Sequence, residues 1–231
     1  APPPPESRDR CAVEERPLAA FILQYFRRRE NIRRIVNGLR RVRAADGTEL
    51  LVNNDGASDH KEWMAALTKK GDFMVSMANL HEIRGYNRLA KFASARFLVF
   101  LQDDDQPKTD TWLAEAVRLF VAHPKMALLG GFRGRLDYGT KKQIGQVDGP
   151  KYGALTGSRE NCCRHIGHKD PSTRLPFMFV YKVNMGPMIA RRYYFHSLGM
   201  FNADMSCPGS PGIGFDYEFS IRCWANGYQV G

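Results

Sequence analysis

The sequence lacks any uninterrupted apolar run of about 18 residues, the length that a membrane-spanning helix needs. Its first residues also lack the charged, apolar and small-residue regions of a secretory signal peptide. Neither a transmembrane segment nor a signal peptide is therefore expected within residues 1–231. Association with a membrane is expected only through segments that this chain does not contain.

Cysteine is scarce and irregularly spaced. An odd number of cysteines with no regular spacing does not define a disulfide framework, although one or two bridges in an oxidising lumen stay compatible with the sequence. Residues 162–168 place two cysteines and two histidines in a CC-x-H-x-x-H cluster. Because this is not an established zinc-ligand spacing, a plain polar loop is favoured over a zinc site. The five cysteines are Cys11, Cys162, Cys163, Cys207 and Cys223.

Acidic residues are in deficit. The chain has 34 Lys and Arg against 24 Asp and Glu, a net charge of +10. Such a balance suggests polyanionic partners, but arginines between residues 27 and 43 also fit a solvated helix face, and no nucleic-acid-binding motif accompanies them. Nucleic acid is therefore not expected as a partner.

Residues 1–16 are rich in proline and poor in apolar residues, which predicts an extended linker or stem before a domain at 17–231. A stem would place the domain in the Golgi lumen, and a linker is equally compatible with the cytoplasm.

Strand and helix patterns alternate through this domain. Apolar runs predict strands at 18–26, 49–53, 72–77, 96–101, 126–129 and 182–190. Three- and four-residue apolar spacing predicts helices at 30–42, 60–69, 81–94, from 110 onward, at 192–198 and at 217–226. This alternation predicts an α/β fold with a mostly parallel central sheet and helices on both faces.

Three consecutive acids, residues 103–105, follow the apolar run 96–101. Adjacent carboxylates repel one another unless a cation neutralises them, and oxygen ligands suit Mg²⁺ or Mn²⁺. Open α/β sheets bind their ligands at the carboxyl ends of the strands. The triplet therefore indicates a metal-bound nucleotide diphosphate; a solvated acidic turn is the alternative, and the triplet alone does not separate the two.

Two polar segments precede the triplet. In the turn 53–59, Asp55 is placed to accept hydrogen bonds from a base or ribose, or else to satisfy its own backbone as an ordinary turn residue. In the helix 81–94, Arg84 and Asn87 are candidates to orient a nucleotide or its phosphates, and a solvated helix start is the alternative.

One segment follows it. Residues 212–218 combine two glycines with Asp216 and Glu218 at the start of the last helix. A carboxylate there either caps the helix or serves as a general base for an acceptor hydroxyl.

The order and spacing of these four segments, over roughly residues 18–231, resemble the inverting family-2 glycosyltransferases of the GT-A fold. Residues 26–32 stand where that family has a Tyr-Asn-Arg-Pro-Glu-Asn-Leu-like stretch, and 53–59 stand at its Val-Asp-Asp-Gly-Ser-Thr-Asp turn. Residues 85–89 are similar to its Ala-Arg-Asn-x-Gly helix, and 103–105, followed by Pro107, to its metal-binding Asp-x-Asp. The Gly-Gly-Phe and Gly-Glu-Asp-x-Asp-Leu-x-x-Arg elements are matched by 198–201 and 214–222.

The resemblance implies a metal-dependent inverting transferase. It would move a sugar from a nucleotide-sugar to a hydroxyl of a glycan, glycoprotein or lipid-linked acceptor. A UDP-sugar is the favoured donor, with GDP- and TDP-sugars as alternatives. The stretch 132–181, with several basic residues, is expected to shape the acceptor pocket.

The resemblance also implies the site residues. Mn²⁺ or Mg²⁺ would be held by Asp105, assisted by Asp103. Asp216 would be the general base, with Glu218 in reserve. The nucleotide would be contacted by Gln24, Phe26, Asp55, Arg84, Asn87, Asp103 and Asp104.

The chain departs from the family pattern at several positions. Tyr86 stands in place of an Arg, Asn53 and Asn54 in place of acids, and Phe215 in place of a Glu. These changes suggest an inactive nucleotide- or glycan-binding module as an alternative. A nucleotidyltransferase and, on charge alone, a nucleic-acid-binding domain are further alternatives.

Overall fold

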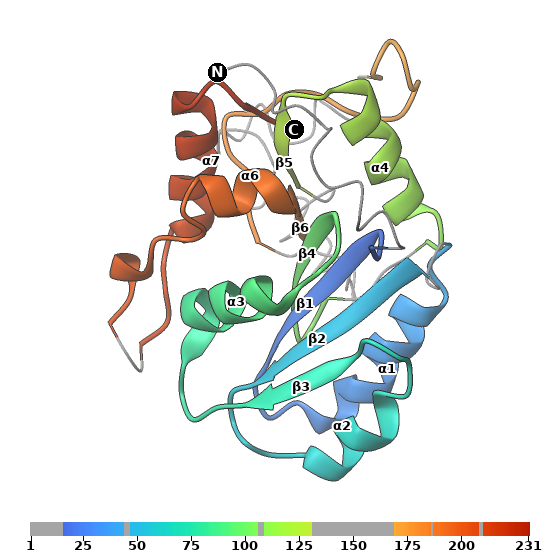
Figure 1. Ribbon diagram of the computed structural model, residues 1–231, viewed down its shortest axis with the longest axis vertical. Helices are drawn as coiled ribbons and strands as arrows, with labels where there is room; N and C mark the ends of the chain where they lie inside the picture. Colours follow the sequence, from blue (N-terminus) through green and yellow to red (C-terminus); the bar gives the residue numbers. More distant parts are fainter. Residues whose placement is uncertain (1–15, 44–46, 106–108, 131–168, 186, 208–209) are drawn as a thin grey trace, which may run out of the picture.

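A computed structural model describes residues 16–43, 47–105, 109–130, 169–185, 187–207 and 210–231. Strands alternate with helices along the chain (Figure 1). The strands are β1 (Ala19–Tyr25), β2 (Thr48–Asn54), β3 (Phe73–Ser76), β4 (Phe97–Gln102), β5 (Met126–Gly130), β6 (Met188–Arg191) and β7 (Gln229–Val230). The helices are α1 (Arg29–Arg40), α2 (His60–Ala66), α3 (His81–Phe92), α4 (Trp112–Ala122), α6 (Arg192–Ser197), the 3-10 helix η5 (Ala203–Met205) and α7 (Phe215–Ala225).

The strands of the described residues form one seven-stranded sheet in the order β3-β2-β1-β4-β6-β5-β7. The first four strands in this order pair in parallel, as do β5 and β7. Only β6 runs antiparallel to its neighbours, β4 and β5. The predicted α/β fold with a mostly parallel sheet is confirmed, and the parallel strands bring their carboxyl ends to one edge.

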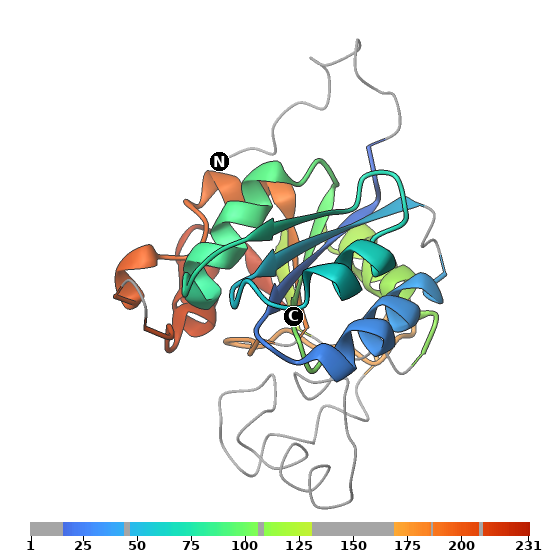
Figure 2. The same cartoon turned by 90° about the horizontal axis from the view of Figure 1, so that it is seen from below.

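Two hydrophobic cores lie on opposite faces of this sheet. Side chains alternate along β1, so that Phe21 and Leu23 join one core while Ala20 and Ile22 join the other. The first core is covered by α1, α2 and α4, and the second by α3, α6 and α7 (Figures 1 and 2). Buried strands with apolar residues at nearly every position follow from this double covering.

Helix α1 confirms the periodicity seen in the sequence. Its buried residues are Ile32, Ile35, Val36 and Leu39, and they face the first core. None of the helices in the described ranges has the length and apolarity needed to span a bilayer.

The segment before β6 differs from the prediction of one strand at 182–190, because β6 begins only at Met188. Pro187 has no N–H to give to a neighbouring strand. The N–H of Val183 donates instead to Ser220 Oγ at 3.2 Å, and that of Met185 to Asp216 Oδ2 at 3.0 Å. Residues 183–185 are thus held by side chains of α7 and not by a strand partner.

Three predictions concern residues outside the described ranges: the linker up to residue 15, the Cys/His cluster at 162–168, and residues 132–168 of the stretch expected to shape the acceptor pocket.

Candidate active site

The acidic triplet lies where the sequence predicts it, directly after β4 at the carboxyl edge of the sheet. Asp103 Oδ2 accepts a hydrogen bond of 2.9 Å from the N–H of Phe26, the residue that follows β1. Burial raises the pKa of Asp103, although this hydrogen bond and the neighbouring Arg28 act against the rise. Phe26 itself is 48% exposed.

Asp105 has different surroundings from the two acids before it. Its side chain is buried, and its Oδ2 accepts a hydrogen bond of 2.7 Å from the N–H of Gln102, which closes the turn of the triplet. The structure therefore places this predicted metal ligand inside the turn.

Arg28 joins the other two acids. Its Nη1 lies 3.0 Å from Asp103 Oδ1 and 3.1 Å from Asp104 Oδ2. Burial tends to lower the pKa of this guanidinium, but the two carboxylates outweigh that effect and raise it. One cation is thus held between Asp103 and Asp104, which are the oxygen ligands that a divalent ion would use.

The family resemblance implies a metal, and the residues present fit one. No three His, Cys, Asp or Glu side chains of the described residues are grouped as a complete metal site. Mg²⁺-type ions in nucleotide sites commonly take only one or two carboxylates, and substrate phosphates and waters complete their shell. The pair Asp103 and Asp104, already holding a positive charge, suits that mode of binding.

Asp216 lies in the first turn of α7 and is buried. It accepts hydrogen bonds from the N–H of Met185 at 3.0 Å and from that of Tyr217 at 2.9 Å. Burial raises the pKa of Asp216, while these N–H groups and the ammonium of Lys182 act to lower it. A carboxylate with a raised pKa, fixed by its backbone contacts, has the properties of a general base.

Asp55 is occupied by the backbone. Its two carboxylate oxygens accept hydrogen bonds from the N–H groups of Leu80 and His81, at the start of α3. Asn79 and His81 both have positive φ, at 57° and 59°, a conformation that side-chain-bearing residues rarely adopt. Asp55 therefore stabilises the strained backbone of residues 79–81.

Gln24 lies under α3. Its Oε1 accepts a hydrogen bond of 2.8 Å from Asn53 Nδ2, which ties the end of β1 to that of β2. Gly85 of α3 rests on this amide pair, where a Cβ would lie 2.3 Å from Gln24 Oε1. The glycine is therefore required for α3 to approach the sheet so closely.

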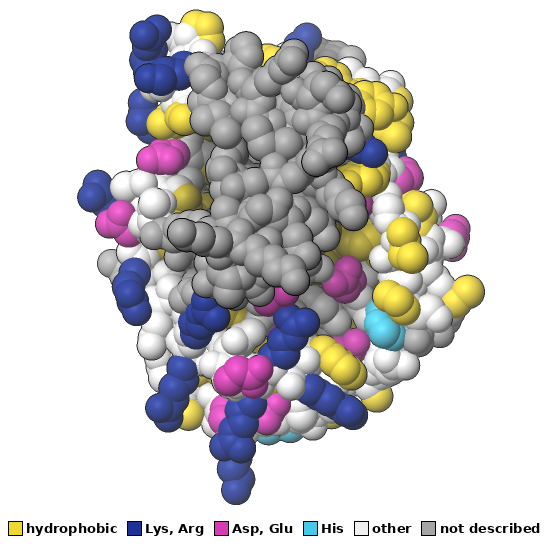
Figure 3. All heavy atoms as spheres, turned by 180° about the vertical axis from the view of Figure 1, so that it is seen from behind, with side chains coloured by type: hydrophobic (Ala, Val, Ile, Leu, Met, Phe, Trp, Pro, Cys, Tyr) yellow, Lys and Arg dark blue, Asp and Glu magenta, His cyan; other side chains and the backbone are white. Residues whose placement is uncertain are grey.

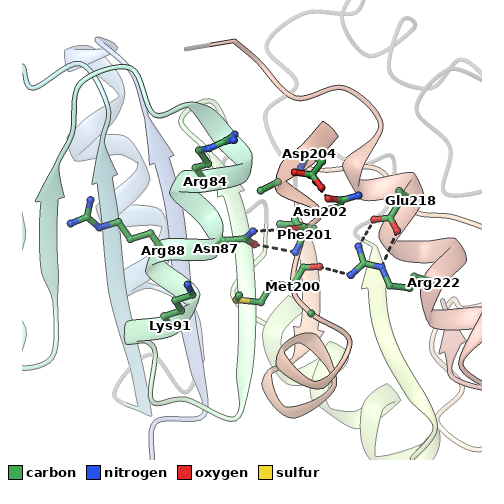
Figure 4. Close-up of a pocket in the computed structure, with 12 residues that line it drawn as sticks. Arg84, Asn87, Arg88, Lys91, Met200, Phe201, Asn202, Asp204, Glu218 and Arg222 are labelled. Carbon is green, nitrogen blue, oxygen red and sulfur yellow. Dashed lines mark hydrogen bonds and ion pairs between the residues drawn. The ribbon is translucent and has the colours of Figure 1, made fainter. Parts of the chain in front are cut away.

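Three more predicted residues lie apart from the triplet, in a pocket of about 610 Å³ between α3 and α7 (Figure 4). Asn87 exchanges two hydrogen bonds with the backbone of Phe201, at 2.7 and 3.0 Å. Arg84 donates to the carbonyl of Ser206 at 2.9 Å. Both oxygens of Glu218 are engaged by Arg222, one turn further along α7.

Glu82 was not identified from the sequence. It lies in the first turn of α3, and its Oε1 accepts a hydrogen bond of 2.9 Å from Gln102 Nε2, next to the triplet. An acid in the first turn of a helix is common because it favours the helix dipole, so nothing in the local sequence marked this one.

The fold is that of a GT-A-type α/β domain, and acids gather at the carboxyl edge of its sheet. The sequence matches the family described as glycosyl transferase family 2 over residues 21–183, and the chain belongs to that family. No curated protein sequence matches it.

Several solved structures share the fold. The mannosyltransferase PcManGT from Pyrobaculum calidifontis, in complex with GDP-Man and Mn²⁺, is 14% identical with a TM-score of 0.62, over 93% of this chain and 54% of that one. S. aureus TarS 1–349 is 15% identical with a TM-score of 0.58, over 93% and 58% of the two chains. TarS 1–349 in complex with UDP-GlcNAc is 13% identical with a TM-score of 0.62, over 93% and 56%. The chain thus spans a little over half the length of these proteins.

Proposed function

We propose that the chain is the catalytic domain of a metal-dependent, inverting glycosyltransferase that transfers a sugar from a nucleotide-sugar to a hydroxyl acceptor. One observation carries the proposal: Asp103 and Asp104 share the guanidinium of Arg28 at the carboxyl end of β4. Family membership and the GDP-Man and UDP-GlcNAc complexes of structurally similar proteins support it.

The triplet edge would bind the donor. Mn²⁺ or Mg²⁺ would be held by Asp103 and Asp104, and would supply positive charge to the diphosphate leaving group. Arg28 lies beside both acids, at a place from which its guanidinium would turn to the phosphates. The half-exposed ring of Phe26 would lie against the base.

Asp216 would take the proton from the acceptor hydroxyl. The freed oxygen attacks the anomeric carbon from the face opposite the diphosphate, the bond to the diphosphate breaks, and the configuration inverts. Between the two candidates on α7, Asp216 is supported because its carboxylate accepts backbone N–H groups, whereas Arg222 engages both oxygens of Glu218.

The remaining predicted residues are assigned supporting roles. Asp55 stabilises the backbone of residues 79–81 at the start of α3, and Gln24, bonded to Asn53, supports the first turns of that helix. Arg84 and Asn87 join α3 to the segment between α6 and α7. These four would shape the donor site without contacting the nucleotide.

A nucleic-acid-binding domain is less well supported. On the face shown in Figure 3, the basic side chains of the described residues are interspersed with acidic and hydrophobic ones and do not form a continuous basic surface.

The test is nucleoside diphosphate release from UDP-, GDP- and TDP-sugars with Mn²⁺, compared with an Asp104→Asn variant. Slow donor hydrolysis is expected for one donor even without the acceptor, and its loss in the variant. Metal-dependent nucleotide binding with no turnover on any donor or acceptor glycan would instead identify an inactive binding module. Release of pyrophosphate would identify a nucleotidyltransferase.

A further inference from the structure

Glu82 lies between the two halves of the candidate site. Gln102, whose Nε2 donates to Glu82 Oε1 at 2.9 Å, is the residue before the acidic triplet. The backbone of Gln102 is held in turn by Asp105. The carboxylate of Glu82 is therefore fixed at the end of β4, next to the acids that would bind the diphosphate.

The same turn of α3 also contacts the segment that leads into α7. A Cβ on Gly212 would lie 2.2 Å from Ile83 Cδ1, so the residue after Glu82 touches this segment directly. One turn further, the ring of Tyr86 lies 6.4 Å from that of Phe215, the neighbour of Asp216. The start of α3 is thus wedged between the strand of the triplet and the helix of the base.

Electrostatics agree with this placement. Burial raises the pKa of Glu82, and the charges of Asp216, Asp103 and Asp104 raise it further, against the hydrogen bond from Gln102. Acids from both halves of the site therefore lie close enough to influence this carboxyl.

A donor sugar has little freedom in such a site. Its anomeric carbon is bonded to the diphosphate and must face the acceptor oxygen, which the base deprotonates. The sugar ring therefore lies between the triplet and Asp216, in the space that Glu82 borders. Glu82 Oε2 has no hydrogen-bond partner among the described residues.

We propose that Glu82 binds the transferred sugar, with its free carboxylate oxygen accepting a hydrogen bond from a sugar hydroxyl, and so helps to select the donor. This inference rests on the proposed function. Hydrogen bonds to charged groups discriminate strongly, because a sugar without that hydroxyl leaves the carboxylate unpaired.

The experiment compares calorimetric binding of UDP and GDP with that of UDP-GlcNAc and GDP-mannose, all with Mn²⁺, in the wild type and in Glu82→Gln. Glutamine keeps an oxygen for Gln102 but removes the charge. For the nucleotide whose sugar the wild type accepts, we expect the variant to bind the nucleotide-sugar roughly tenfold more weakly, and the nucleotide alone within about twofold of the wild type.

Glu115→Gln is the matched control. Glu115 is also an acid in the first turn of a helix, α4, which covers the other face of the sheet. It should change neither affinity, and thermal unfolding should show that all three proteins are folded.

The outcomes separate the two proposals. An equal loss for nucleotide and nucleotide-sugar in Glu82→Gln would show that Glu82 only supports the site, and no loss for either would exclude a contact; both overturn the inference alone. Failure of the wild type to bind any of UDP, GDP and TDP with Mn²⁺ would overturn the proposed function, and this inference with it.

Discussion

Charged side chains gather both at the carboxyl edge of the sheet and in the pocket between α3 and α7, but the acids of the two regions are paired differently. In the pocket, Glu218 and Arg222 neutralise each other within one helix. At the edge, the guanidinium of Arg28 is shared between Asp103 and Asp104, and Asp216 accepts two backbone N–H groups. The acids of the edge are thus not paired one to one within a helix, as Glu218 and Arg222 are.

This difference separates the predicted site residues at the edge from those in the pocket, a division that the sequence alone could not make. Burial raises the pKa of Asp103 and of Asp216, so keeping these acids charged opposes folding. Groups that are held in an unfavourable state by their surroundings are typical of functional sites. We infer that the edge performs the chemistry and that the interactions in the pocket hold the helices together.

The largest difference between the edge and the pocket is expected when one acid of α7 is neutralised in each of them. Asp216→Asn should lower kcat for sugar transfer by roughly a thousandfold, because it removes the general base. Glu218→Gln should lower it by less than about tenfold, since the side chain only partners Arg222. Steady-state release of nucleoside diphosphate measures both, and the opposite ranking would move the base to Glu218.

The pH dependence of kcat tests Asp216 as the general base in a second way. A base must be deprotonated, so kcat should fall as the pH falls through the pKa of Asp216, which burial raises above its ordinary 3.8. The charged form is also the one that burial disfavours. The folded chain binds a proton at this raised pKa, whereas the unfolded chain binds it only near pH 3.8. The free energy of unfolding should therefore rise as the pH falls through the raised pKa. An acid limb at the ordinary carboxyl pKa would contradict the assignment.

Within the edge, the proposed function gives Asp103 and Asp104 the role of metal ligands and leaves Asp105 to stabilise the turn. Asp104→Asn should weaken Mn²⁺-dependent nucleotide binding by roughly a hundredfold, because it removes half of the carboxylate pair that holds a cation. Asp105→Asn should affect metal-dependent binding less, since its carboxylate accepts a backbone N–H inside the turn. Calorimetry with and without Mn²⁺ measures both, and a larger loss in Asp105→Asn would restore Asp105 as the metal ligand.

Much of the fold could be predicted from the sequence because its helices and strands are strongly patterned. The helix expected at 30–42 is observed as α1 at Arg29–Arg40, with Ile32, Ile35, Val36 and Leu39 buried as their spacing implies. The strand expected at 96–101 is β4 at Phe97–Gln102. Such segments are determined by local apolar periodicity, which is visible in one sequence.

The division within the site could not be predicted, because it depends on contacts between distant segments. Asn87 is bonded to Phe201, 114 residues away, and Asp55 to residues 25 and 26 positions later. Residues 182–185 carry strand-like side chains, yet the N–H groups of Val183 and Met185 donate to side chains of α7. Glu82 was missed for the same reason, since its partner Gln102 belongs to the next strand.

A smaller effect is expected at Arg28, which tests whether the edge needs a cation. Arg28→Gln removes the charge shared by Asp103 and Asp104, so Mn²⁺ should bind the nucleotide-free protein roughly two- to fivefold more tightly. The nucleotide diphosphate, which would lose a phosphate contact, should bind the metal-loaded variant more weakly. Calorimetric titration measures both affinities. Arg33→Gln, on the exposed side of α1, is the control. Unchanged Mn²⁺ binding in Arg28→Gln would mean that Arg28 does not occupy the place of the ion.

The smallest effect on the chemistry is expected in the pocket, at Asn87. Asn87→Ala leaves the N–H and the carbonyl of Phe201 without their side-chain partner, which should lower the free energy of unfolding by about 1–3 kcal/mol. Nucleotide affinity with Mn²⁺ should stay within about twofold, because the amide faces Phe201 and not the triplet. Chemical denaturation and calorimetry measure the two quantities, and Asn37→Ala on exposed α1 surface should change neither. A large loss of nucleotide affinity in a folded Asn87→Ala protein would join the pocket to the donor site and remove the distinction between the two regions.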